Sequence, residues 1–141
     1  MLIKQLSVFI ENRAGRLEQV TETLKENGIN ITSLSLADTS EYGMLRMIVS
    51  DPQLGKQVLK AAGFSSMLTD VIAVKLPHKI GMLHELLKTL EAVNIEYMYA
   101  LATNENAAMI LKISSNEAAL KALQANGFEL VQEELAYTIN G

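Results

Sequence analysis

Two short loops of this chain contain the residues best suited to holding a small charged molecule. The first is Glu11-Asn12-Arg13-Ala14-Gly15-Arg16-Leu17, and the second is Pro77-His78-Lys79-Ile80-Gly81-Met82-Leu83. In each loop a glycine stands where a predicted helix begins, so no side chain keeps a ligand away from the backbone. The unpaired N–H groups and partial positive charge of a helix N-terminus are suited to binding a carboxylate.

An ammonium group bound near that carboxylate needs hydrogen-bond acceptors. Asn12 in the first loop and Asn30 further along the chain can each offer a side-chain oxygen without burial of a full charge. Glu96 can pair with an ammonium directly. These residue types favour the binding of a zwitterion, although turn glycines and capping asparagines also serve purely structural roles.

Other chemistries lack the residues that they need. The chain has no cysteine, which excludes disulfides, thiolate catalysis and thiolate metal sites. His84-Glu85-Leu86-Leu87-Lys88 resembles a zinc-protease helix but has lysine where the second histidine must stand. His78 and His84 have no carboxylate placed to complete a metal site, so we expect neither a metal nor another cofactor.

The composition of the 141 residues is that of a globular protein with a real core. Hydrophobic residues make up 49% and charged residues 20%, and the net charge of −4 argues against a nucleic-acid-binding surface. No run of residues approaches the length of a membrane span, and the start has no basic segment followed by a long apolar one. We therefore expect a cytoplasmic protein with no nucleic-acid or membrane partner.

The sequence repeats itself with an offset of 66 residues, which predicts a repeated structure. The residues that match at this offset are Val8, Gly15, Leu17, Thr23, Leu24 and Ile29 with Val74, Gly81, Leu83, Thr89, Leu90 and Ile95. Later in each half the offset is 64, and the matches are Ser50, Leu59, Ala61, Gly63 and Phe64 with Ser114, Leu123, Ala125, Gly127 and Phe128. We place the two-residue change between 38–43 and 104–107.

Each half predicts the element order β-α-β-β-α-β. Alternating apolar residues indicate strands, 3.6-residue spacing indicates helices, and Asn27-Gly28, Asn94, Gly63 and Gly127 are the predicted helix ends. Asp51 and Ser115 are predicted N-caps of the second helices, and final strands are expected from Phe64 and Phe128. The fold class is therefore α+β, with two ferredoxin-like units that we place at residues 1–68 and 69–141.

The two loops, together with Glu26-Asn27-Gly28-Ile29-Asn30-Ile31, resemble the ACT domain, a regulatory module that senses amino acids. The family pattern is Asn-x-Pro-Gly-x-Leu before a helix and Gly-(Ile/Val)-Asn-Ile at the second strand. Both halves match, the first more closely, so the whole chain resembles a tandem ACT protein. Ala14 and Ile80 replace the family's proline, while His78 replaces Asn12 and Glu96 replaces Asn30.

The resemblance implies a particular assembly and two unequal ligand sites. Side-by-side units of this family join edge strands, which here would give one eight-stranded antiparallel sheet with four helices on one face. A ligand lies between the loop of one unit and the second strand of its neighbour. One site would combine Asn12, Arg13, Ala14, Gly15, Arg16 and Leu17 with Glu96, Tyr97 and Met98. The other would combine His78, Lys79, Ile80, Gly81, Met82 and Leu83 with Asn30, Ile31 and Thr32.

Three functions compete for this sequence. The first is a non-catalytic sensor that binds a free amino acid between two ACT units and regulates amino-acid metabolism, acting alone or on a separate biosynthetic enzyme. Within this class, the chain could be a regulatory subunit of an acetolactate-synthase-like enzyme. The second is an acylphosphatase-like enzyme on the same fold, which Arg13 and Asn30 would allow but Lys79 and Glu96 disfavour. The third is a ligand-free dimerisation scaffold. We favour the sensor, without enzymatic activity and as a homodimer.

Overall fold

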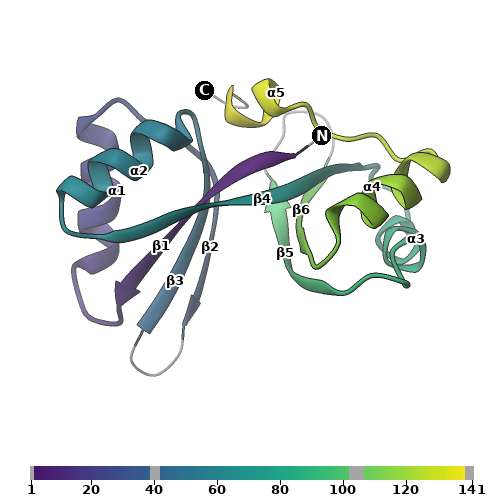
Figure 1. The fold of residues 1–141 in the computed structure, drawn as a ribbon, viewed down its shortest axis with the longest axis horizontal. Helices are drawn as coiled ribbons and strands as arrows, with labels where there is room; N and C mark the ends of the chain where they lie inside the picture. The colour runs from purple at the N-terminus through teal and green to yellow at the C-terminus, as the bar shows by residue number, and fades with distance from the viewer. Residues whose placement is uncertain (1, 39–41, 102–106, 139–141) are drawn as a thin grey trace. The chain divides into compact units, whose positions relative to one another are not determined.

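The computed structural model describes residues 2–38, 42–101 and 107–138. The chain divides into two compact units, of which one is Lys4–Thr69 and the other begins at Asp70 and includes Leu2 and Ile3. The described residues form six strands and five helices (Figure 1): β1 Ile3–Glu11, α1 Arg16–Glu26, β2 Ile31–Asp38, β3 Tyr42–Val49, α2 Pro52–Ala61, β4 Ser65–Leu76, α3 Met82–Thr89, β5 Ile95–Leu101, β6 Ala107–Ile113, α4 Asn116–Ala125 and α5 Glu133–Thr138.

The α+β class is confirmed, and the described pairings β1–β3, β2–β3, β4–β6 and β5–β6 are antiparallel. The hydrogen-bonded order of the strands is β2-β3-β1-β4-β6-β5. The expected eight strands and four helices are wrong for two reasons. The last strand of the first half and the first strand of the second half are one continuous strand, β4, of 12 residues. The strand expected from Phe128 is reduced to a bridge between Leu130 and Val74, and helix α5 follows it.

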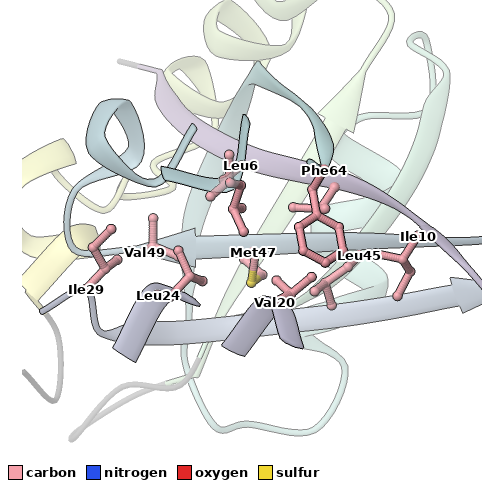
Figure 2. Packing of buried hydrophobic residues seen from close by; sticks show 11 residues of the cluster. Leu6, Ile10, Val20, Leu24, Ile29, Leu45, Met47, Val49 and Phe64 are labelled. Carbon is pink, nitrogen blue, oxygen red and sulfur yellow. The ribbon is translucent and has the colours of Figure 1, made fainter. Parts of the chain in front are cut away.

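The core of the first unit lies between its strands and the helices α1 and α2. Alternate residues of β1 and β3 point to the helices, and Val20 and Leu24 of α1 meet them with no exposed surface. Figure 2 shows this packing, with Phe64 at its edge. Gly55 of α2 lets the helix approach closely, because a Cβ there would lie 2.9 Å from a methyl carbon of Leu6.

The second unit repeats this arrangement with its own core. Residues Ile72, Val74 and Leu76 of β4 pack with Leu86 and Leu90 of α3 in this cluster. The short segment after α4 lies beside β4, where Lys75 N donates to Glu129 O and Val131 N donates to Ala73 O, each at 2.9 Å. This segment takes the position of a fourth strand beside β4. Each unit therefore buries one continuous apolar cluster under two helices.

Helix termini follow the predicted capping residues, with one exception. The carboxylate of Asp51 accepts a hydrogen bond from Leu54 N at 3.1 Å, and the hydroxyl of Ser115 accepts one from Ala118 N at 3.4 Å. Helix α1 ends at Glu26 with Asn27 as its C-cap, as expected. Helix α3, by contrast, ends at Thr89 with Leu90 as its C-cap, well before the predicted Asn94.

The shorter α3 corrects the internal alignment of the two halves. Ile31 pairs with Val49, and Ile95 pairs with Ile113, so the offset is already 64 where the second strands begin. Both strands then carry a register shift at the same place, between Ile31 and Ser33 and between Ile95 and Tyr97. The two-residue change therefore lies between the first helix and the second strand, and not in the later loop where we placed it.

Candidate functional site

The first loop is a tight turn that leads directly into α1. Arg13 N donates to Glu11 O at 2.9 Å, Arg16 N donates to Arg13 O at 3.4 Å, and Gln19 N donates to Gly15 O at 3.1 Å. Gly15 is the N-cap, with φ 87° and ψ −13°, a left-handed conformation that favours glycine. Asn12, Arg13, Ala14 and Gly15 are all exposed.

The second loop has the same backbone. Lys79 N donates to Pro77 O at 2.9 Å, Met82 N donates to Lys79 O at 3.3 Å, and Glu85 N donates to Gly81 O at 2.9 Å. Gly81 is the N-cap of α3, again with φ 87°. The hydrogen-bond distances and the backbone angle agree with those of the first loop, so the two turns are structural copies despite their different side chains.

Neither helix receives a side-chain hydrogen bond at its N-cap. The glycines have no side chain to donate or accept, and an ideal Cβ at Gly15 or Gly81 would meet nothing within 4 Å. The first-turn N–H groups therefore have no side-chain cap, although Arg16 N and Met82 N donate to the loop carbonyls, and the partial positive charge of the helix terminus favours an anion. Carboxylate binding at the two loops stays a prediction.

The second loop also lines a shallow hollow of about 480 Å³. Its walls are Leu76 to Leu83 and Ala107, so six of the predicted ligand residues, His78 to Leu83, line one surface. Ile80 is fully exposed, with a relative exposure of 106%, and Leu83 is 45% exposed. The hollow thus combines an apolar wall with the open helix terminus.

Asn30 and Ile31 lie elsewhere in the first unit. They line another hollow, of about 410 Å³, with Thr21, Lys25, Gly28 and Ile29. This hollow lies at the C-terminal end of α1, whereas the loop lies at its N-terminal end. The 11 residues of α1 place about 16 Å between the two ends. The acylphosphatase-like alternative requires Arg13 and Asn30 to lie close together, and the first unit places them at opposite ends of α1.

Asn30 is held by its backbone rather than by its side chain. Ser50 N donates to Asn30 O, and Asn30 N donates to Ser50 Oγ, each at 2.9 Å. In the second unit Ser114 N donates to Asn94 O at 3.1 Å. Asn94 is thus the residue of the second unit that is structurally equivalent to Asn30, and the expectation that Glu96 replaces Asn30 is wrong. The string Val93-Asn94-Ile95, beside Ile29-Asn30-Ile31, was the sequence signal for Asn94.

Glu96 corresponds to Thr32 and already has a cationic neighbour. Its carboxylate lies 3.3 Å from Lys112 Nζ, with the Glu96 side chain 45% exposed. Tyr97 and Met98 are partly buried, and Met98 packs against the core of the second unit. The union of either loop with the second strand of the other unit stays a prediction.

The arginines of the first loop also have neighbours. The guanidinium of Arg13 lies 3.3 Å from the carboxylate of Glu11. Arg16 Nη1 donates to Gln19 Oε1 at 2.7 Å, and its guanidinium carbon lies 4.4 Å from the ring centroid of Phe64. The side chain of Arg16, which we predicted to bind ligand, therefore contacts two residues of its own unit, Gln19 and Phe64.

Within the described part of the chain, no group of three His, Asp or Glu side chains is placed to hold a metal ion. The same residues include no helix long and apolar enough to cross a membrane.

The family model for the ACT domain pair matches residues 1–139. The chain belongs to this family. Because the match covers both halves, the predicted resemblance is confirmed. ACT domains are regulatory modules. No match was found among curated proteins.

Solved structures share this ACT domain pair fold. Protein BT0572 from Bacteroides thetaiotaomicron has a TM-score of 0.93 and 37% identity, with 99% of this chain and 98% of that chain covered. The ligand-free regulatory subunit of aspartate kinase from Thermus thermophilus has a TM-score of 0.61 and 16% identity, covering 86% and 90%. The regulatory subunit of aspartate kinase from Thermus flavus has a TM-score of 0.61 and 21% identity, covering 89% and 93%. At these identities, the likeness to the two aspartate kinase regulatory subunits shows that they share the fold of this chain.

Proposed function

We propose that this ACT domain pair is a non-catalytic sensor of free amino acids that regulates amino-acid metabolism through a partner enzyme. The observation that carries the proposal is the pair of glycine-capped helix termini. Gly15 and Gly81 share one left-handed conformation, and neither helix has a side-chain cap. The α-carboxylate of an amino acid binds to the first-turn N–H groups of these helices.

The second loop offers more than the terminus itself. Its hollow of about 480 Å³ has apolar walls that suit an aliphatic or aromatic side chain. The fold supports a regulatory role, because the aspartate kinase regulatory subunits share it.

A thermal-shift panel of the twenty amino acids tests ligand binding. A ligand that binds the folded state raises the melting temperature as its concentration exceeds the dissociation constant. We expect at least one amino acid to do so, and its carboxamide, which lacks the carboxylate, to produce no shift. A panel in which no amino acid shifts the transition would instead favour the ligand-free scaffold.

Leu17→Asp and Leu83→Asp then locate the site. Each variant places a carboxylate in the first turn of its helix, where it competes with the ligand while the helix dipole stabilises it. The matched control is Leu87→Asp, which makes the same change one turn further along α3. We expect Leu17→Asp or Leu83→Asp to abolish the ligand-induced shift and Leu87→Asp to retain it. Retention of the shift in the two first-turn variants alike would refute carboxylate binding at these termini.

A further inference from the structure

The two units differ at one position where their backbones agree. In the first unit the guanidinium of Arg16 covers the ring of Phe64, which is 6% exposed. Phe64 N donates to Leu59 O at 2.9 Å, and in the second unit Phe128 N donates to Leu123 O at 3.0 Å. Phe128 therefore stands where Phe64 stands. Met82, the first residue of α3, stands where Arg16 begins α1.

The second unit has a cavity beside its phenylalanine. It has a volume of about 210 Å³ and is lined by Lys75, Pro77, Met82 and the segment 126–129. Phe128 is one of the lining residues and is only partly buried. A methionine at position 82 thus leaves open a space beside the ring, where the first unit has its own guanidinium.

The two units also differ in the charged residues near Arg16 and Met82. Ser65, which follows Phe64, is matched by Glu129, and Gln19, which accepts the hydrogen bond from Arg16, is matched by Glu85. The second unit therefore lacks the guanidinium and has two more carboxylates at these positions, while Lys75, which stands where Phe9 stands, adds a cation at the edge of the cavity. The carboxylate of Glu129 lies 3.3 Å from Lys75 Nζ, and its side chain is 76% exposed, so it is accessible to a second cation.

We propose that the cavity beside Phe128 binds the guanidinium group of a small molecule such as free arginine. The guanidinium lies over the Phe128 ring, as that of Arg16 lies over Phe64, and its N–H groups donate to the carboxylate of Glu129, which lines the cavity. Lys75 at the edge of the cavity pairs with a carboxylate of the ligand. This cavity differs from the loop hollow, although Pro77 and Met82 line both, and the proposal holds whether or not the loops bind amino acids.

Methyl NMR of the protein labelled at its methionines tests the binding directly. Met82 lines both the cavity and the loop hollow, so methylguanidinium, which has no carboxylate for the helix terminus, is the probe that distinguishes them; Met47 is fully buried in the first unit and serves as the reference. We expect arginine and methylguanidinium to shift the Met82 signal and leave Met47 unchanged. An equal response to n-butylamine would overturn the assignment to guanidinium, and no response to millimolar arginine would overturn the site.

Two variants copy the first unit into the second. Met82→Arg supplies the internal guanidinium, and Glu129→Ser restores the residue that follows Phe64. We expect each to weaken methylguanidinium binding at least tenfold, measured from the amide signals of Gly127 and Phe128. The matched controls on exposed α4 positions are Gln124→Arg and Glu117→Ser, which we expect to bind as the unaltered chain does. Unchanged affinity in Glu129→Ser would refute the proposal even if Met82→Arg did not fold.

Discussion

Replacement of the two cap glycines by alanine isolates a purely conformational energy. Gly15 and Gly81 share φ 87°, and a Cβ at either position would meet nothing within 4 Å. Steric contact with the rest of the protein therefore contributes nothing. A non-glycine residue in the left-handed region costs about 1–2 kcal/mol. Alanine also restricts the unfolded chain, which returns about 0.4–1 kcal/mol. Each variant should therefore lose about 1 kcal/mol of the free energy of unfolding.

Urea unfolding followed by circular dichroism measures this loss. Gly15→Ala and Gly81→Ala should lose the same free energy, because their backbone geometry is the same. Gly15→Asn and Gly81→Asn are the matched variants and should lose less, since asparagine tolerates the left-handed region better than alanine does. A loss of more than about 3 kcal/mol would mean that the Cβ meets packed atoms. Unequal losses at the two positions would refute the structural equivalence of the loops.

Three further predictions concern the packing of the first unit and the helix caps. Gly55→Ala should lower the free energy of unfolding by about 1 kcal/mol, because crowding against Leu6 outweighs the gain in helix propensity; calorimetry should show a lower melting temperature. Leu24→Ala should cost about 3 kcal/mol in urea unfolding, and Leu34→Ala, at a half-exposed position, less than about 1 kcal/mol. Asp51→Ala should cost about 1 kcal/mol, and Ser115→Ala less because its cap bond is longer, as paired thermal melts would show.

Local patterns predicted most of the elements. The alternation of apolar residues in Leu6, Val8 and Ile10 placed β1, and the caps at Asp51 and Ser115 placed the starts of α2 and α4. These signals are local, because a side chain two to four residues away decides each of them. The repeat then allowed one half to support the other.

The end of the second unit could not be read in the same way. Leu130 and Val131 suggest a strand, but Glu133, Leu135 and Ala136 are good helix formers, and α5 begins at Glu133. Whether a strand extends depends on the partner it finds, and here the pairing with β4 stops after one bridge. Tertiary pairing of this kind leaves no mark on the local sequence.

The candidate site was predictable in its loops but not in its surroundings. Gly15 and Gly81 were identified from their place before an amphipathic pattern. The match of Asn94 to Asn30 was missed, because a two-residue deletion in a helix end looks the same in sequence as one in a loop. The contact of Arg16 with Phe64 joins residues 48 positions apart in the chain, and no local pattern announces it.

The continuous strand β4 limits how the two halves can change in length. Side chains alternate between the two faces of a strand, so one residue added near Thr69 would put the part of β4 after it out of phase with the part before it. Since Ile72, Val74 and Leu76 keep their own core, an insertion at this junction should interrupt β4 rather than unfold the second unit. The stretch from the start of α3 to the start of β5 tolerates length changes, because it is two residues shorter than the corresponding stretch from the start of α1 to the start of β2. Gene variants that differ in length should accordingly accumulate in that stretch and avoid the junction.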